Sequence, residues 1–289
     1  MAEIHLVKEK QLATNANAPC LWPLVRLLGW THSSYFMLSM FFIIIFVIGV
    51  VWWPLAEANM AIIDWSQPLW LEIVRKMDWL LLFDFAVMSL LIMARADLKS
   101  DALIVFVGFA GGLVIESWGT QTHLWNYFTL ERPPLWIIPA WPIASLSIDR
   151  LFRLTDYVLR NTKSHGAWRI VYWLVFATFY ALMFRFVWPT LDKSLTVVAL
   201  VLCAFLILTP TDYRGAVLTF AAGSGLGYFL ELWGTTRACW VYYTFDTPPL
   251  FAVLAHGMAA VAFWRVALLA RVFWEKFVDR SHDPSTAGS

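Results

Sequence analysis

The chain has 289 residues, of which 60% are hydrophobic and 14% charged, with a net charge of +1 and a mean hydropathy of +0.65. Soluble domains carry about 25% charged residues, so this composition indicates a polytopic membrane protein. The small net charge excludes a nucleic-acid-binding surface. Cys20, Cys203 and Cys239 are too few and too scattered for a disulfide framework or a metal cluster.

Eight apolar stretches predict eight transmembrane helices, each roughly 17–25 residues long and able to cross a hydrocarbon core of about 30 Å. They cover 35–55, 77–95, 101–118, 135–155, 167–189, 194–210, 214–233 and 249–273. The connection 57–76 predicts a short amphipathic helix at the outer interface. Of the 21 Lys and Arg residues, 15 fall on the N-terminal side of the membrane. This excess predicts an integral protein of a bacterial-type inner membrane with both termini in the cytoplasm.

One motif occurs twice, at an offset of 115 residues: ten of the twenty positions in 116–135 are identical to those in 231–250. The first copy contains Glu116, Trp118, Gly119, Thr120, Trp125, Tyr127, Thr129, Pro133, Pro134 and Leu135, and each recurs 115 positions later. Such a match indicates an internal duplication. Each repeat contains four helices, an even number, so both repeats have the same orientation. The predicted fold is an all-α integral membrane protein of about eight transmembrane helices, built as two tandem four-helix repeats in parallel.

These boundaries divide the chain into five segments. They are a cytoplasmic N-terminal segment (1–34), a first transmembrane repeat (35–158), a cytoplasmic linker (159–166), a second transmembrane repeat (167–275) and a disordered C-terminal tail (276–289). Within each repeat, two glycines precede the motif glutamate at four-residue steps: Gly108 and Gly112, then Gly223 and Gly227. Small residues at this spacing allow close helix approach, so we expect the third and seventh helices to pack together.

Four ionisable residues are the candidate catalytic groups, because ionisable groups inside a membrane are functional candidates. Glu116 and Glu231 lie near the outer ends of the third and seventh helices. Asp84 and His256 lie about 10 Å inside the second and eighth helices, at a rise of about 1.5 Å per residue. All four are therefore expected in one layer, in the outer third of the membrane. A structural interpretation stays open, in which the glutamates fix their loops and Asp84 and His256 form a satisfied polar pair.

The two repeats differ at two of these positions. Asp84 corresponds to Ala199, and His256 corresponds to Trp141. The residues that both copies share therefore suggest a structural role. Asp84 and His256, which occur in one copy each, suggest a specialised role.

Aromatic residues follow both glutamates and, with one arginine, form the candidate substrate-binding set. The set consists of Trp118, Trp125, Tyr127, Trp141, Trp233, Trp240, Tyr242 and Arg185. A neutral buried carboxylic acid can protonate an alkene, and aromatic faces stabilise the resulting cation. An interfacial aromatic belt would place the same residues without any chemistry. No metal-ligand spacing such as HxxxH, HExxH or CxxC is present, so we expect neither a metal nor a cofactor.

The first motif copy resembles a known family. Glu116, Gly119, Thr122, Trp125, Tyr127, Pro133, Pro139 and Trp141 form a pattern similar to that of the bacterioruberin-type hydratases among the carotenoid-biosynthesis membrane proteins. A more distant similarity links it to the small membrane lycopene cyclases. The family pattern has extra Gly and Pro residues between its Thr and Tyr, and Thr122 becomes Arg237 in the second copy. The resemblance implies acid catalysis without a cofactor on a carotenoid or related isoprenoid.

Three functions follow as hypotheses. The first is an integral membrane enzyme that acts by acid catalysis on a polyene or isoprenoid lipid, as a hydratase, cyclase or isomerase. The second is a non-catalytic subunit of a membrane complex that binds pigment, quinone or lipid through its 18 tryptophans and other aromatic residues. The third is a proton-linked transporter. The expected partners are the bilayer, a lipid or isoprenoid substrate and other membrane proteins, but no nucleic acid.

Overall fold

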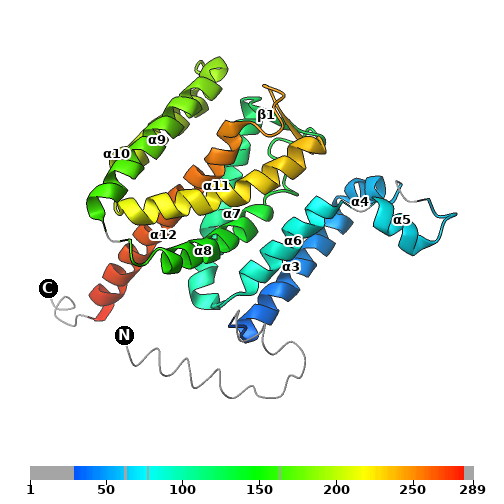
Figure 1. Cartoon of the computed structure of the whole chain (residues 1–289), viewed down its shortest axis with the longest axis horizontal. Coiled ribbons are helices and arrows are strands. Elements are labelled where there is room, and N and C mark those ends of the chain that lie inside the picture. Colours follow the sequence, from blue (N-terminus) through cyan, green and yellow to red (C-terminus); the bar gives the residue numbers. More distant parts are fainter. Residues whose placement is uncertain (1–28, 62–63, 77, 163, 283–289) are drawn as a thin grey trace.

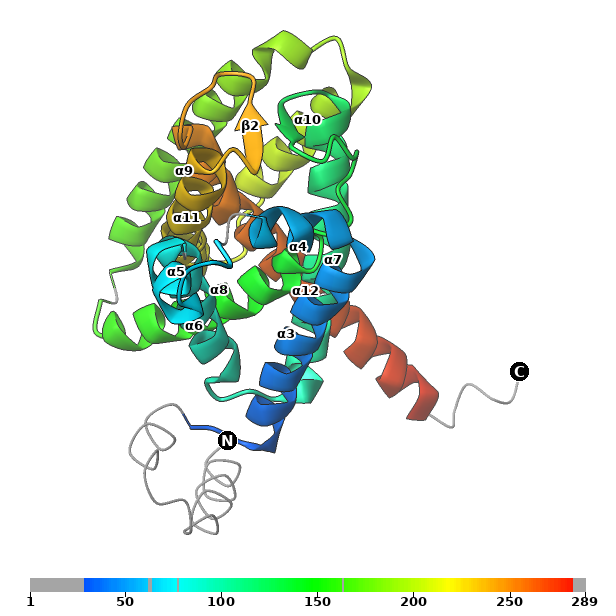
Figure 2. The same cartoon turned by 90° about the vertical axis from the view of Figure 1, so that its right-hand side faces the viewer.

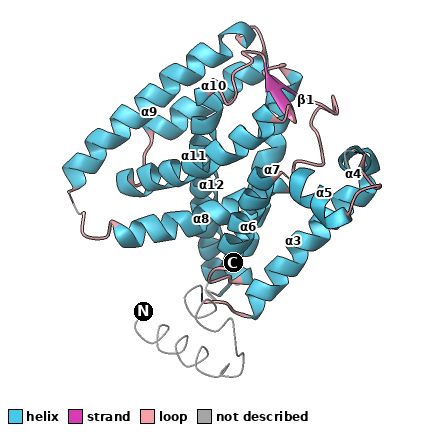
Figure 3. Cartoon of the chain, turned by 45° about the vertical axis from the view of Figure 1, so that its right-hand side comes forward, coloured by secondary structure: helices cyan, strands magenta, loops and turns pink. Residues whose placement is uncertain are grey.

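The computed structural model describes residues 29–282, apart from 62–63, 77 and 163. These residues are mostly helical, with two short strands, β1 (Trp125–Tyr127) and β2 (Trp240–Tyr242), at one end of the molecule (Figure 3). The helices are α3 (His32–Val51), α4 (Trp53–Met60), α5 (Leu69–Lys76), α6 (Trp79–Met93), α7 (Leu98–Gln121), α8 (Ala140–Val158), α9 (His165–Val187), α10 (Ser194–Leu208), α11 (Tyr213–Thr236) and α12 (Leu250–His282). A 3-10 turn, η1 (Trp188–Thr190), follows α9. The helical membrane class is as predicted.

Five helices are long and apolar enough to cross a membrane: α3, α7, α9 with η1, α11 and α12. Two further apolar helices, α6 and α10, have 15 residues each, or about 22 Å against a core of about 30 Å. The 19-residue α8 is long enough, but it contains four charged residues: Asp149, Arg150, Arg153 and Asp156. A helix therefore lies at each of the eight predicted positions, and five of them meet both criteria for crossing.

Four helices form the centre of the bundle. Helix α8 packs on α7 and α11, and α12 packs on α11 and α7. Two peripheral hairpins lie on opposite sides of this centre, α3 with α6 and α9 with α10 (Figures 1 and 2). The first hairpin contacts α8 and α11 through α6, and the second contacts α11 and α12 through α9. Helix α11 is consequently the most enclosed of the five long apolar helices, because both hairpins pack against it.

Aromatic rings fix α9 against α11 and α12. Phe176 and Phe179 are fully buried, and both pack against Phe220 of α11. Phe179 also stacks on Phe251 near the start of α12. Ring pairs of this kind add about 0.5–1.5 kcal/mol each beyond the area that they bury. They hold the second repeat in one arrangement and therefore set the relative positions of α11 and α12.

The glycines bring together different helices from those predicted. A Cβ on Gly112 would lie 2.3 Å from the Trp141 side chain of α8, and one on Gly223 would lie 2.9 Å from the Gly257 backbone of α12. The close pairs are thus α7 with α8 and α11 with α12, each within one repeat. The expectation that the third and seventh helices pack together is therefore wrong, because small residues permit close approach without selecting the partner.

Arginines cap helix ends at the end of the bundle opposite the strands, which we call the basic end. Arg150 donates to the Ala94 carbonyl at 2.9 Å and forms an ion pair with Asp101 at 2.6 Å, with both side chains buried. Its counterpart 115 residues later, Arg265, donates to the Leu206 carbonyl at 2.9 Å. These contacts satisfy carbonyls that the ends of α6 and α10 leave without helical partners.

The structure describes the connection 57–76, apart from 62–63, and the first residues of the tail 276–289. The amphipathic helix expected within 57–76 is present as α5. The tail 276–289 was expected to be disordered from its first residue, but α12 continues to His282, so that boundary is wrong. No Gly or Pro interrupts the sequence between Gly257 and Pro284, so nothing in this stretch breaks the helix. Residues 1–28 of the predicted N-terminal segment and 283–289 of the tail lie outside the described residues.

Candidate functional site

Glu116 lies on the last turns of α7 and is buried, with an exposed fraction of 4%. Three side chains donate to its carboxylate. Trp125 Nε1 donates to Oε2 at 3.0 Å, Tyr127 Oη donates to Oε1 at 3.0 Å, and Trp141 Nε1 donates to Oε1 at 3.1 Å. Its buried carboxylate oxygens are thus satisfied, as an acceptor out of contact with water requires.

Glu231 has the same surroundings at the end of α11. Trp240 Nε1 donates to Oε2 at 2.9 Å, and Tyr242 Oη donates to Oε1 at 2.8 Å. The third contact comes from His256, whose Nε2 lies 3.0 Å from Oε1. The imidazole of His256 therefore replaces the indole of Trp141 at the equivalent position, and this is the main chemical difference between the two clusters.

The tyrosines act as donors because their hydroxyls stay protonated. Burial and the Glu116 carboxylate raise the pKa of Tyr127 well above its ordinary value. Burial and the Glu231 carboxylate raise the pKa of Tyr242 in the same way. Both phenols consequently donate to their glutamates over the whole physiological pH range.

Each motif glycine makes room for its tryptophan. A Cβ on Gly119 would lie 1.9 Å from the Trp125 ring, and one on Gly234 would lie 2.0 Å from the Trp240 ring. The glycine lies three positions after the glutamate, so both are on one helix face. The indole therefore crosses the helix at the glycine and reaches the carboxylate beyond it. This contact explains why the motif has Gly after Glu and Trp nine positions after Glu.

The chain turns back at the same point in both copies. His123 and Ala238 have positive φ angles of 60° and 51°, and each follows the end of its helix. Thr120 and Thr235 each donate Oγ1–H to the carbonyl of their glutamate at 2.6 Å. These local contacts direct each loop so that the strand with its Trp and Tyr lies over the glutamate.

The two clusters meet through a short sheet and a pair of stacked rings. Strands β1 and β2 pair antiparallel, with Trp125 opposite Tyr242 and Tyr127 opposite Trp240. Trp141 in the first turn of α8 and His256 in the second turn of α12 stack their rings, with centroids 5.6 Å apart and planes inclined by 22°. The described structure thus brings Glu116, Glu231, Trp141 and His256 together.

Other candidates lie elsewhere. Asp84 is buried in α6 with an exposed fraction of 3%, and its Oδ2 has no hydrogen-bond partner in the described part of the chain. It does not form the expected polar pair with His256, whose partner is Glu231. Arg185 is exposed at the outer end of α9 and makes no contact with either glutamate. Neither Asp84 nor Arg185 belongs to the cluster.

Trp118 and Trp233 connect the two repeats. Trp118 Nε1 donates to Thr196 Oγ1 of α10 at 3.2 Å, and Trp233 Nε1 donates to Asp78 Oδ2 at 2.9 Å. Arg237 also forms an ion pair with Asp78. Partial burial raises the pKa of Asp78, but the hydrogen bonds from Arg237, Leu81 and Trp233 outweigh it and leave the pKa below its ordinary value. These tryptophans therefore position the hairpins rather than line a site.

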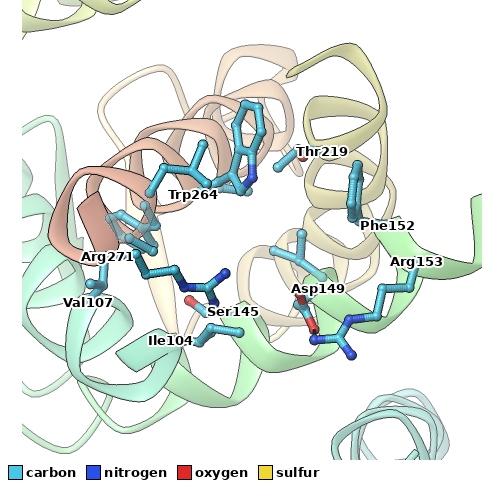
Figure 4. Close-up of a pocket in the computed structure, with 14 residues that line it drawn as sticks. Ile104, Val107, Ser145, Asp149, Phe152, Arg153, Thr219, Trp264 and Arg271 are labelled. Carbon is cyan, nitrogen blue, oxygen red and sulfur yellow. Dashed lines mark ion pairs between the residues drawn. The ribbon is translucent and has the colours of Figure 1, made fainter. Parts of the chain in front are cut away.

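A cavity of about 290 Å³ lies between α7, α8, α11 and α12 (Figure 4). Ser145 and Ala260 line it, and they lie one turn beyond Trp141 and His256 toward the basic end. Phe263 separates the cavity from the stacked rings, because it lines the cavity and packs edge-on against Trp141. Sequence reasoning missed this cavity, Asp78 and the Asp101–Arg150 pair, since each depends on contacts between distant segments.

No family model, curated protein or solved structure matches this chain. Among the described residues, no group of three or more His, Cys, Asp or Glu side chains is arranged to hold a metal ion. A functional conclusion therefore rests on the geometry of the cluster and the cavity.

Proposed function

We propose that the protein is an integral membrane enzyme built as two tandem four-helix repeats in parallel orientation. The helices α3, α6, α7 and α8 then correspond to α9, α10, α11 and α12. The shared 115-residue offset of the carboxylate contacts, turns and arginine caps supports this correspondence. All eight helices would cross the membrane, and the basic end with both termini would face the cytoplasm of a bacterial-type inner membrane.

The observation that carries the proposed chemistry is the pair formed by His256 and Glu231. The glutamate accepts from His256 Nε2 at 3.0 Å while Trp240 and Tyr242 hold its carboxylate in place. A carboxylate in this position orients an imidazole and fixes which nitrogen faces it. His256 Nδ1 has no hydrogen bond to any described residue, so it is the atom from which a proton can be transferred.

The proposed substrate is a polyene or isoprenoid lipid. The imidazolium donates its Nδ1 proton to one carbon of a double bond, and the other carbon becomes a cation. The Trp141 face next to His256 stabilises such a cation. Capture by water followed by proton loss gives a hydrated product, attack by a second double bond followed by proton loss gives a ring, and proton loss alone gives an isomer. No cofactor is needed in any of these outcomes.

The two glutamates then have different roles. Glu231 positions His256, while Glu116 positions Trp141 and has no imidazole among its three partners. The similarity of the motif to the carotenoid-modifying membrane proteins supports the same class of substrate. Asp84 is not used in this mechanism, because it lies outside the cluster.

The test replaces His256 by tryptophan, the residue that the first repeat has at this position. The indole N–H can still donate to Glu231, so the fold is retained while the transferable proton is lost. Membranes containing each variant are incubated with lycopene and with geranylgeraniol, and products are analysed by mass spectrometry. The native chain should form products that are isomeric with the substrate or one water heavier. His256→Trp should lower their formation by about 10²–10⁴-fold, the usual contribution of a general acid.

His165→Trp is the matched control, because His165 is exposed at the start of α9 and far along the chain from the cluster. It should leave product formation unchanged. Full turnover by His256→Trp, or no product from the native chain with either lipid, would contradict the proposal.

A second candidate is a non-catalytic subunit of a membrane complex that binds pigment, quinone or lipid. One observation favours it: α9 packs on α11, but α3 makes no corresponding extensive contact with α7. The exposed face of α7, with Phe106, Phe109 and Val114, is therefore available to a neighbour. Isolation of the native complex in mild detergent tests this candidate, which predicts a constant set of accompanying membrane proteins.

A further inference from the structure

The cavity between the four central helices changes in polarity along its length. Toward the stacked rings, it is lined by Val107, Ala260 and Phe263. Toward the basic end, it is lined by Asp149, Arg153 and Arg271. Arg271 lies eleven residues after Ala260 on α12, which is a distance of about 16 Å along the helix axis at the helical rise. An elongated ligand would thus have one end among apolar side chains and the other among charged ones.

The charged groups around the cavity have an excess of positive charge. Asp149 forms ion pairs with Arg150 at 2.5 Å and with Arg153 at 2.9 Å, and Arg150 is also paired with Asp101. Arg271 has no ion pair with any side chain in the described part of the chain. Figure 4 shows its guanidinium extending from α12 toward the middle of the cavity, while the Asp149–Arg153 pair lies at the rim. Among the described side chains, three arginines against two aspartates leave the charge of Arg271 without an ion-pair partner.

A cavity with one apolar end and an excess of positive charge at the other end favours an anionic amphiphile as its ligand. Guanidinium groups bind phosphate oxygens through two parallel hydrogen bonds, and basic pockets between transmembrane helices on the cytoplasmic side bind lipid head groups. The volume of about 290 Å³ lies at the lower limit of ligand sites, which span about 300–1,000 Å³. It accommodates one chain next to its head group, but not a lipid with two chains.

We propose that this cavity binds the head and first part of the chain of a single-chain lipid phosphate. The phosphate contacts Arg271 at the basic end, and the chain lies along Phe152, Ala260 and Phe263. A prenyl phosphate and an alkyl phosphate share this chemistry. Binding does not require proton transfer by His256, so this site goes beyond the proposed enzymatic function.

The test is equilibrium binding to the purified full-length protein in detergent. The probes are farnesyl phosphate and dodecyl phosphate, with farnesol, dodecanol and inorganic phosphate as comparisons. Both lipid phosphates, or one of them, should bind at least about tenfold more tightly than the matching alcohol and than inorganic phosphate. A preference between the two lipid phosphates distinguishes a prenyl chain from a saturated alkyl chain. The proposal would be overturned if an alcohol bound as tightly as its lipid phosphate. It would also be overturned if inorganic phosphate bound as tightly as the lipid phosphates.

Two variants locate the site. Arg271→Gln should weaken binding of the preferred lipid phosphate by about tenfold or more, because a charge-assisted contact is lost. The matched control, Arg169→Gln on the exposed face of α9, should bind as the native chain does. Ala260→Phe should weaken binding by filling the apolar part. Unchanged binding by both cavity variants would overturn the proposal. His256→Trp should still bind the lipid phosphate, so the two proposals can fail separately.

Discussion

At the scale of single residues, the cluster depends on the absence of a side chain as much as on the presence of others. Trp125 reaches Glu116 only because Gly119 leaves space for the indole. A carboxylate buried without its donors would cost several kcal/mol. The glycine, the tryptophan and the glutamate are therefore one unit, and each is needed by the other two.

This dependence predicts a large effect of one added methyl group. Gly119→Ala should lower the free energy of unfolding by about 3 kcal/mol, because the Cβ would overlap the Trp125 ring. Gly225→Ala on α11 is the matched control, since no atom lies within 4 Å of its added Cβ. It should be neutral or stabilising by about 0.5–1 kcal/mol. Thermal unfolding in detergent measures both, and equal changes in the two variants would contradict the explanation of the motif.

At the scale of elements, equivalent arginines of α8 and α12 perform related tasks with different partners. Arg150 and Arg265 both donate to carbonyls at the end of a preceding helix. Only Arg150 also has a buried carboxylate partner, because Asp101 corresponds to Ala216. The duplication thus retained the helix cap, while the ion pair belongs to one repeat.

The difference predicts unequal stability effects for the same substitution. Arg150→Met should lower the free energy of unfolding by about 3–5 kcal/mol, because it leaves the Asp101 charge buried without its partner. Arg265→Met should lower it by about 1–2 kcal/mol, because the hydrogen bonds to the Leu206 carbonyl and the Thr209 hydroxyl are lost. Thermal unfolding of the two variants under one set of conditions gives the comparison. An effect of Arg265→Met as large as that of Arg150→Met would show that the ion pair contributes little.

At the scale of the whole molecule, the two repeats are joined where their motifs meet. The strands pair across the repeat boundary, and Trp141 stacks on His256. Trp118 and Trp233 add contacts from each motif to a helix of the other repeat. The two halves consequently form one site rather than two.

This arrangement predicts a specific covalent link. Asn126 and Val241 lie directly opposite in the sheet, and opposed residues have Cα atoms about 4.5–5.5 Å apart, within the range of a disulfide. Asn126→Cys with Val241→Cys, in a chain whose native cysteines are replaced by alanine, should oxidise to one bridge. After cleavage at a protease site inserted between Asn161 and Thr162, the halves should stay together on a denaturing gel until reductant is added.

The control for the link places the first cysteine at Leu130, which is exposed and outside the paired strand. Halves with cysteines at 130 and 241 should separate without reductant. Separation of the 126/241 pair under the same conditions would contradict the strand pairing.

The sequence by itself determined the membrane class, the approximate positions of the helices, the two copies of the motif and the presence of both glutamates at helix ends. These properties follow from local composition and spacing, because a bilayer requires long apolar helices whatever their partners are. The tertiary structure decided which groups meet. It placed Trp141 and His256 on the glutamates 25 positions before them, directed the glycines to α8 and α12, and left Asp84 apart. Contacts between distant helices depend on how whole surfaces pack, and no local pattern contains that information.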